Sequence, residues 1–228
     1  MIKRTALFSV LLIALYGHCY AQNTDDILNK YFEANRITKM ASVNSVTVTG
    51  KITGTIINGA SIEYSVRKLR PYKQCMELNN RGEISKTVFD GRSEWVISKG
   101  KTVKNPYDVE EQRKRKICFE GDIFYCKNNG YLIEYNGIVN IEGIDLYLIK
   151  ITNKDDFDAS YYIDPGSFML LKSVEGSLIT YYSNFKSVDG IIFPFSIKII
   201  TGIKGEFTEL NIDKIELNNE IEPSVFTK

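Results

Sequence analysis

The chain has 228 residues, of which 43% are hydrophobic, 12% aromatic and 25% charged, with a formal net charge of +1 at pH 7. Its single histidine, His18, lies in a segment that we predict to be a cleavable leader. The mature chain therefore cannot support Ser-His-Asp or Cys-His catalysis, histidine zinc sites or haem ligation by histidine. Acidic and basic residues are almost balanced, which argues against nucleic acid as a partner.

Residues 1–21 have the three parts of a secretory signal peptide. Lys3 and Arg4 form a positive start, residues 6–16 are an apolar run, and Ala21 ends a small-x-small cleavage site. The apolar run is shorter than the about 20 residues that a membrane-spanning helix needs. We therefore predict export to the periplasm with cleavage near Ala21.

We do not expect a lipid anchor at Cys19. Signal peptidases that make lipoproteins need a small residue just before the cysteine, and here that residue is His18. No linker, repeat or low-complexity segment divides the rest of the chain. The sequence thus predicts a signal peptide over residues 1–21 and a single domain over residues 22–228.

Three cysteines remain after cleavage, namely Cys75, Cys118 and Cys126. An odd number in an exported protein leaves at least one free thiol or an intermolecular bridge. On one helix, Cys118 and Cys126 would lie about 12 Å apart, beyond the roughly 7 Å limit for a disulfide. A bridge between them requires a turn at residues 120–121. We expect structural thiols or one adventitious disulfide, and no metal site.

The first element of the mature chain is a predicted helix over residues 25–40, with a capping start at residues 24–26 and an apolar stripe. From about residue 43 the pattern changes to alternating strands. The first two are separated by Asn58-Gly59, the sharpest hairpin signal in the chain.

Many short strands joined by tight turns favour an antiparallel meander over βαβ units. Turn pairs such as Arg81-Gly82, Lys99-Gly100, Asn136-Gly137, Glu142-Gly143 and Asp189-Gly190 separate the later strands. We predict these strands over residues 72–78, 84–89, 94–98, 131–135, 145–152, 159–163, 168–174, 178–185, 191–201 and 207–217.

Residues 106–129 interrupt the strands with a predicted helical insertion. Asp108 and Glu111 resemble a capping box, with Pro106 just ahead. The pairs Glu110–Lys114 and Glu111–Arg115 have the i,i+4 spacing that stabilises helices. We expect one helix here.

A second short helix is predicted after Gly121, which breaks the first, and Asp122 is placed to cap it. The first helix carries a basic run over residues 113–116. Such a run could bind an acidic partner or a lipid head group, but it is more often a solvated helix face.

The sequence offers no named nucleophile or base for an enzyme. Its acidic residues follow no pattern that separates a glycosidase pair from surface charge, and it contains no P-loop or dinucleotide fingerprint. Asp155, Asp156 and Asp158 hint at calcium, but EF-hand spacing is missing, and we interpret them as a solvated hairpin tip. We predict no catalytic residues, metal or cofactor, although a carboxylate-based hydrolase stays a minor alternative.

Several predicted strands are apolar on both faces. In residues 145–152, Leu146 and Leu148 face one way while Tyr147, Ile149 and Ile151 face the other. A one-sided antiparallel sheet would alternate apolar with polar residues. Two apolar faces need two covers, and a curved sheet with a helical insertion is one way in which apolar ligand cavities are built.

Four segments, in this order, resemble the periplasmic lipoprotein carriers of the LolA/LolB type. They are Arg70-Pro71-Tyr72-Lys73, the Asp-Gly-x-x-x-Trp hairpin over residues 89–96, Tyr161-Tyr162-Ile163-Asp164-Pro165, and the C-terminal stretch over residues 221–226. Each motif is short, and their common order carries the likeness. The lid segment, with its cysteines and basic run, does not match the carrier pattern.

The resemblance implies an α+β fold, in which a large, strongly curved antiparallel sheet forms an unclosed β-barrel. An N-terminal helix and a mid-chain helical lid would cover it. The arginine of the Arg-Pro segment, here Arg70, would hold the lid through backbone carbonyls, with Ile123 and Phe124 as lid residues. An ordinary surface arginine that stabilises a turn is the alternative for Arg70.

The implied apolar cavity would shield an acyl chain. The side chains that we predict to bind this ligand lie on the strands: Val46, Val48, Ile62, Tyr64, Val66, Met76, Leu78, Trp95, Ile97, Leu146 and Leu148.

The function that we predict is an exported, monomeric, non-enzymatic protein that sequesters an acyl chain or lipoprotein for periplasmic transport. The alternative is a periplasmic sensor or protein-interaction module of the same fold. That module would use the basic helix and a sheet edge to bind a membrane-associated protein partner.

Overall fold

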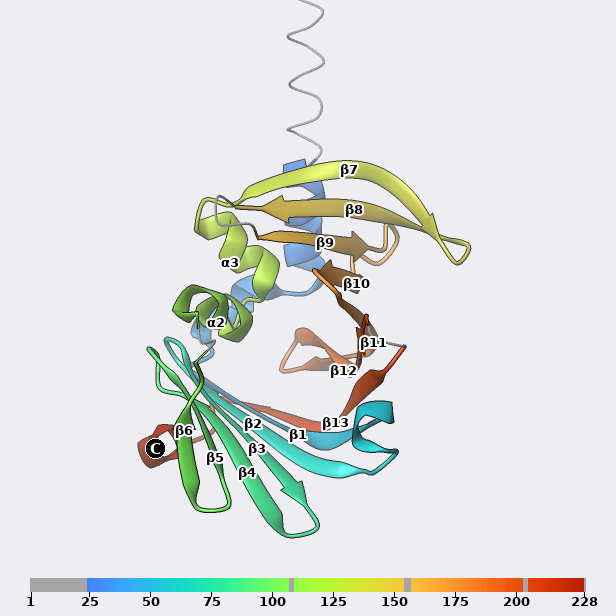
Figure 1. The fold of residues 1–228 in the computed structure, drawn as a ribbon. Helices are drawn as coiled ribbons and strands as arrows, with labels where there is room; N and C mark the ends of the chain where they lie inside the picture. The colour runs from blue at the N-terminus through green and yellow to red at the C-terminus, as the bar shows by residue number, and fades with distance from the viewer. Residues whose placement is uncertain (1–23, 107–108, 154–156, 203–204, 228) are drawn as a thin grey trace, which may run out of the picture.

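The computed structural model describes residues 24–106, 109–153, 157–202 and 205–227. Its centre is a 13-stranded sheet with the order β6-β5-β4-β3-β2-β1-β13-β12-β11-β10-β9-β8-β7. Neighbouring strands are antiparallel, and one pairing, β1 with β13, joins strands that are far apart in the sequence. This confirms the predicted antiparallel meander and its unclosed, curved form (Figure 1).

The two edges of the sheet, β6 and β7, are consecutive strands, and α2 and α3 connect them. The helices therefore cross from one edge of the sheet to the other. Figure 1 shows them on the open side, between the layer that contains β1–β6 and the layer that contains β7–β9. This placement is that of a lid.

The first six strands precede the lid. They are β1 (Ser45–Gly54), β2 (Ile62–Leu69), β3 (Lys73–Asn80), β4 (Glu83–Phe89), β5 (Glu94–Ser98) and β6 (Lys101–Lys104). After α2 (Glu110–Ile117) and α3 (Asp122–Asn128), the strands resume. They are β7 (Leu132–Ile141), β8 (Ile144–Thr152), β9 (Asp158–Ile163), β10 (Leu170–Glu175), β11 (Leu178–Val188), β12 (Ile191–Thr201) and β13 (Phe207–Leu217).

Several X-Gly pairs form the tight turns that the sequence predicts. In Arg81-Gly82, Lys99-Gly100, Glu142-Gly143 and Asp189-Gly190, both residues have positive φ. That conformation is the one a two-residue type I′ hairpin requires, and glycine adopts it without steric cost.

Two predicted turns differ in the structure. Asn58-Gly59 belongs to a longer connection, because the 3-10 turn η2 (Thr55–Ile57) precedes it and β2 begins only at Ile62. Asn136-Gly137 lies inside β7, at a register shift between Tyr135 and Ile138 in the pairing with β8. A bulge takes up the glycine without ending the strand.

The predicted helix over residues 25–40 is broken in two. An α-helix covers residues 24–34, Arg36 adopts a left-handed conformation, and the 3-10 helix η1 (Ile37–Ser42) follows. The side-chain amide of Asn35 donates to the carbonyls of Tyr31 and Phe168 at 2.8 and 3.1 Å, which fixes the break.

The helices pack on one face of the sheet, which we call the inner face. Ile27, Leu28 and Ile123 from the N-terminal helix and α3 form a buried cluster with Ile149 and Tyr161 of β8 and β9. A second inner cluster joins η1 and the lid to β1, β12 and β13 through Met40, Val46, Phe119, Phe195 and Ile215.

The opposite, outer face is covered in part by the C-terminus. The 3-10 helix η3 (Pro223–Phe226) places Phe226 against Cys75 of β3 and Val88 of β4. None of the described helices is long and apolar enough to cross a membrane.

The predicted helical insertion is confirmed, but its local contacts differ from expectation. Lys114 pairs with Glu110 as predicted, whereas Glu111 accepts hydrogen bonds from Tyr125 and Tyr131 instead of pairing with Arg115. Asp108, the expected cap of the first helix, lies outside the described residues.

Asp122 makes no capping hydrogen bond at the start of α3. Its carboxylate instead forms an ion pair with the buried Arg115. The three cysteines Cys75, Cys118 and Cys126 are free thiols, so the expectation of structural thiols holds and the adventitious disulfide does not form.

Candidate functional site

The predicted ligand residues of β1, β2 and β3 share the inner face. Cross-strand register pairs Val48 with Val66 and Val66 with Met76, and it pairs Tyr64 with Leu78. Val46 and Ile62 belong to the same alternating set on β1 and β2. The face is identified by Lys68 of β2 and by Arg70, which directly follows the strand, because both contact the lid.

The other four predicted ligand residues lie on the outer face. Trp95 is opposite Val88, and Ile97 packs against the cluster around Phe226. Leu146 and Leu148 alternate with Tyr147 and Ile149, which pack on the inner cluster. The structure therefore does not bring these four together with the predicted residues of β1–β3.

An apolar row crosses the inner face from β13 to β6. Its members, in order across the strands from β13 to the edge strand β6, are Ile215, Val48, Val66, Met76, Thr87, Val96 and Val103. Exposure rises along the row, from 7% at Ile215 to 40% at Val96 and 59% at Val103. This row of the inner face is thus mostly apolar and becomes more open toward β6.

A small apolar cavity of about 210 Å³ lies between the lid and β9–β12. Its walls come from the N-terminal helix, η1, the link between α2 and α3, and the sheet, and they include Tyr31, Met40, Phe119, Ile123 and Phe193. Of the two predicted lid residues, Ile123 lines this cavity, whereas Phe124 packs edge-on against Phe32 at 5.6 Å.

Arg70 joins three elements near the cavity. Its Nε donates to the carbonyl of Val43 and its Nη2 to the carbonyl of Met40, both at 2.7 Å. Nη2 also lies 2.6 Å from Glu120 Oε1, and the guanidinium stacks on Phe119 at 4.6 Å. The carbonyls that Arg70 binds belong to the end of η1, and its contact with the lid is made through Glu120 and Phe119.

The charge on Glu120 depends on Arg70. Burial alone would raise the pKa of the Glu120 carboxyl, but the hydrogen bond and charge of Arg70, together with hydrogen bonds from the Glu120 backbone and Cys118, outweigh burial and lower the pKa. The neighbouring Lys68 donates to the carbonyl of Ile117 at 3.3 Å, and burial lowers the pKa of Lys68 to about 8.

The basic run of α2 is only partly solvated: Lys116 is exposed, Arg113 and Lys114 are half-buried, and Arg115 is buried. Arg115 is only 1% exposed, and its Nη1 binds both oxygens of Asp122 at 2.7 and 2.8 Å. Its Nη2 lies 2.6 Å from Glu175 on β10, and its guanidinium stacks on Phe157 at 4.0 Å. Lys116 also pairs with Asp122 and Glu175.

At its other side, α2 is tied to the first half of the sheet. Arg113 lies 2.7 Å from the carboxylate of Glu94 on β5, which is 5% exposed. The lid is therefore held by charge pairs to β5, to the end of β2 and to β10. Sequence reasoning missed Glu94 and Glu175, because no local pattern marks a partner that is distant along the chain.

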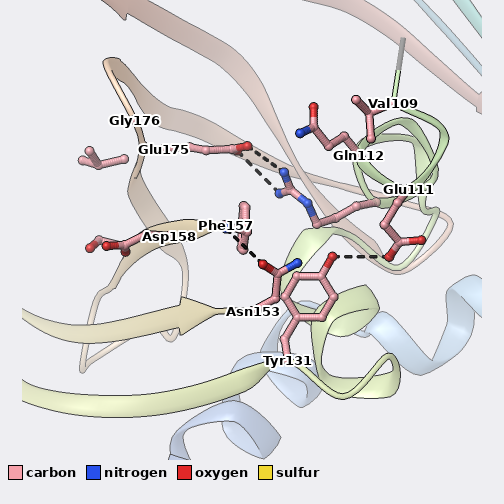
Figure 2. A pocket seen from close by; sticks show the side chains of 12 residues that line it. Val109, Glu111, Gln112, Tyr131, Asn153, Phe157, Asp158, Glu175 and Gly176 are labelled. Carbon is pink, nitrogen blue, oxygen red and sulfur yellow. Dashed lines mark hydrogen bonds and ion pairs between the residues drawn. The ribbon is translucent and has the colours of Figure 1, made fainter. Parts of the chain in front are cut away.

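A second, polar pocket of about 550 Å³ lies between α2 and the β9–β10 region (Figure 2). Arg115 separates it from the apolar cavity, because Arg115 lines the polar pocket while its partner Asp122 lines the cavity. Tyr161 donates to the same Asp122 at 2.6 Å. In the described part of the chain, no group of three or more His, Cys, Asp and Glu side chains could hold a metal ion. Asp155 and Asp156 lie outside it.

Comparison with known proteins identifies the fold. No family model matches the chain, and no curated protein matches its sequence. Among solved structures, an outer membrane lipoprotein-sorting protein domain from Vibrio parahaemolyticus is similar, with a TM-score of 0.63 and 12% identity. The match covers 91% of this chain and 97% of that one.

Two further structures agree. A LolA superfamily protein from Nitrosomonas europaea has a TM-score of 0.62 at 15% identity, covering 90% of this chain and 97% of that one. A DUF1329 family protein from Desulfovibrio piger has a TM-score of 0.61 at 12% identity, covering 88% and 96%. The chain therefore has the LolA-like fold, as the order of its motifs predicts.

Proposed function

We propose that this protein is a non-enzymatic carrier that holds an acyl chain, free or attached to a lipoprotein, against the inner face of its sheet. The observation that carries the proposal is the apolar row from Ile215 to Val103, which becomes more exposed toward the edge. It lies beside an apolar cavity under the lid. The similar structures support the fold on which this reading rests.

The energetics of such a surface favour an apolar ligand. Contiguous exposed apolar surface is uncommon on soluble monomers and marks interaction sites. Burying an acyl chain contributes about 0.8 kcal/mol per CH₂ group, so a dry groove needs no catalytic group to bind it.

The lid would control access to this groove. Arg70 holds the end of η1 and the α2–α3 link together through Met40, Val43 and Glu120. We assign Arg70 the role of a latch that cargo must displace, in line with the carrier resemblance.

The cellular setting is also part of the proposal. The predicted signal peptide would deliver a monomeric mature chain to the periplasm, where acyl chains need shielding from water. The alternative of a partner-binding module loses its main support, because Arg113, Lys114, Arg115 and Lys116 each form ion pairs within the chain.

Uptake of a fluorescent fatty acid tests the proposal, with native mass spectrometry of protein purified from its periplasm as a second measurement. Val96 and Ile84 offer a matched pair, since both are exposed, at 40% and 49%, on neighbouring strands but on opposite faces. Val96→Glu should weaken binding by about tenfold or more, about 1.4 kcal/mol, while Ile84→Glu should leave it unchanged. Wild-type protein that carries no ligand and takes up no fatty acid would refute the proposal.

A further inference from the structure

Lys68 of β2 carries a positive charge beneath the lid that no carboxylate of the described chain balances. Its ammonium group donates to the backbone carbonyl of Ile117 at 3.3 Å, and it forms no ion pair with any described residue. Glu120, the carboxylate that follows Ile117 in the lid, is bound by Arg70 instead. Charged groups that a protein withdraws from water are normally paired. The lysine is therefore placed to bind an anion that the chain itself does not supply.

The neighbours of Lys68 do not provide the missing negative charge. Burial lowers the pKa of Lys68 to about 8, which leaves the ammonium mostly protonated at neutral pH. The titratable group that acts on it is the thiol of Cys118, and burial raises the pKa of that thiol to about 11. Cys118 is thus uncharged at neutral pH, and a bound anion would offset the cost of burying the ammonium.

A second polar donor lies beside Lys68. Gln74 of β3 is its direct partner in the β2–β3 pairing, so both side chains are on the inner face. The side-chain amide of Gln74 makes no hydrogen bond within the part of the chain that the structure describes. Directly opposite side chains of an antiparallel pair start about 4.5–5.5 Å apart. An ammonium and an amide N–H at this spacing can donate to the two oxygens of one carboxylate.

Two apolar pairs continue the same face away from the lid. Val66 lies opposite Met76, and Tyr64 lies opposite Leu78. Val66, Met76 and Leu78 are half-buried and belong to none of the buried clusters that the described residues form. From Lys68 to Tyr64 the strand rises about 13 Å, at about 3.3 Å per residue. The inner face of β2 and β3 therefore offers a polar pair at the lid and an apolar track next to it.

We propose that the inner face binds a free fatty acid, with its carboxylate on Lys68 and Gln74 and its chain along the apolar pairs of β2 and β3. This inference rests on the proposed carrier function and names its ligand. An acyl chain held by an ester or amide bond, as in a lipoprotein, brings no negative charge to Lys68. The ammonium has three N–H donors and uses one on Ile117, so two remain for the carboxylate.

The first test compares ligands that share one alkyl chain and differ in the head group. Decanoate, methyl decanoate and decylammonium displace Nile red, an uncharged apolar dye, from the purified protein. A purely apolar groove favours the ester, because the ester has no charge to desolvate. We expect decanoate to bind about tenfold or more tightly than the ester, and decylammonium to bind most weakly. Equal or tighter binding of the ester overturns the proposal, and this comparison needs no variant.

The second test uses Lys68→Met, with Lys51→Met as a control of equal charge change. Lys51 is exposed on the outer face of β1. Lys68→Met should weaken decanoate binding by about tenfold or more and leave the binding of methyl decanoate within about twofold, which also shows that the variant is folded. Lys51→Met should change decanoate binding by less than about twofold. Unchanged decanoate binding in Lys68→Met overturns the proposal.

The outcomes separate this inference from the carrier function on which it rests. If neither decanoate nor methyl decanoate displaces Nile red, the carrier function fails, and the carboxylate site fails with it. If the ester displaces the dye as well as the acid does, the carboxylate site alone fails. Decyl phosphate is the probe for a phosphorylated lipid as the source of negative charge. Tighter binding of decyl phosphate than of decanoate overturns the assignment of Lys68 to a carboxylate.

Discussion

Arg115 on α2 and Glu175 on β10 form an ion pair of 2.6 Å across 60 residues of sequence, although Arg115 is only 1% exposed. Since the same helix binds Glu94 of β5 through Arg113, α2 connects two distant parts of the sheet. The opening of the curved sheet is thus spanned by charge pairs in addition to apolar packing. Such pairs place the lid in one position and make its stability sensitive to charge.

Loss of Arg115 should destabilise the fold strongly. Arg115→Leu leaves Asp122 and Glu175 close together with Lys116 as their common cation, and breaking a buried pair typically costs about 3–5 kcal/mol. We expect the free energy of unfolding, measured by urea denaturation, to fall by about that amount. Lys114→Leu is the control, because its pair with Glu110 is a helix-surface i,i+4 contact that contributes about 0.3–0.5 kcal/mol. Similar losses in both variants would contradict a special role for Arg115.

Acid should loosen the lid. Burial would raise the pKa values of Glu175 and Glu120 above their ordinary value of 4.5. Both are lowered instead, because Arg115 and Lys116 stabilise the charged form of Glu175, and Arg70 stabilises that of Glu120. A carboxyl with a lowered pKa in the folded chain contributes stability above its unfolded pKa and loses it as the pH falls through the folded pKa.

The free energy of unfolding should therefore decline as the pH falls below about 4.5. Urea denaturation at a series of pH values measures this decline. Glu175→Gln should lower stability at neutral pH and flatten the acid slope. A slope that is the same in wild type and in Glu175→Gln would show that the pair does not govern it.

The order of strands could be predicted from local signals, whereas the faces could not. X-Gly pairs with type I′ geometry, such as Lys99-Gly100, mark hairpins directly. By contrast, Leu146 and Ile149 are both buried on one strand, at 4% and 0% exposure. Nothing in the local sequence says which of them faces the helices, because that depends on how the sheet curves.

For the lid, too, the helices could be predicted from local signals but their distant contacts could not. Its helices follow from helix signals within residues 106–129, but the burial of Arg115 depends on Glu175, whose position is set by the β9–β10 pairing. A run of four basic residues is normally solvated, so the local pattern does not reveal that Arg115 is buried. Arg70 could be singled out from the sequence because the Arg-Pro segment resembles a family motif, and the structure places its side chain against η1 and the lid.

Arg70→Leu should uncouple ligand uptake from release. Without the bonds to Met40, Val43 and Glu120, the lid no longer has its latch. We expect the variant to retain or increase binding of an apolar dye but to release ligand poorly to an acceptor, as measured by transfer to lipid vesicles. Arg67→Leu is the matched control, since Arg67 lies on β2, three residues before Arg70, but faces outward, 3.6 Å from Glu77. Transfer that is unchanged in Arg70→Leu would favour the alternative of a simple surface arginine.

The free thiols provide an independent check of the lid. Cys75 and Cys126 are buried, at 1% and 0% exposure, and burial raises the pKa of the partly exposed Cys118 to about 11. Since the thiolate is the reactive form, Cys118 should be alkylated roughly 100-fold more slowly than an ordinary cysteine near pH 8. Mass spectrometry after timed alkylation should show slow labelling of Cys118 alone in the native protein, and labelling of Cys75, Cys118 and Cys126 in urea.

If the Arg70 latch holds the α2–α3 link closed, Arg70→Leu should speed the labelling of Cys118 while Cys75 stays protected. Fast labelling of Cys75 in the same variant would instead indicate general unfolding.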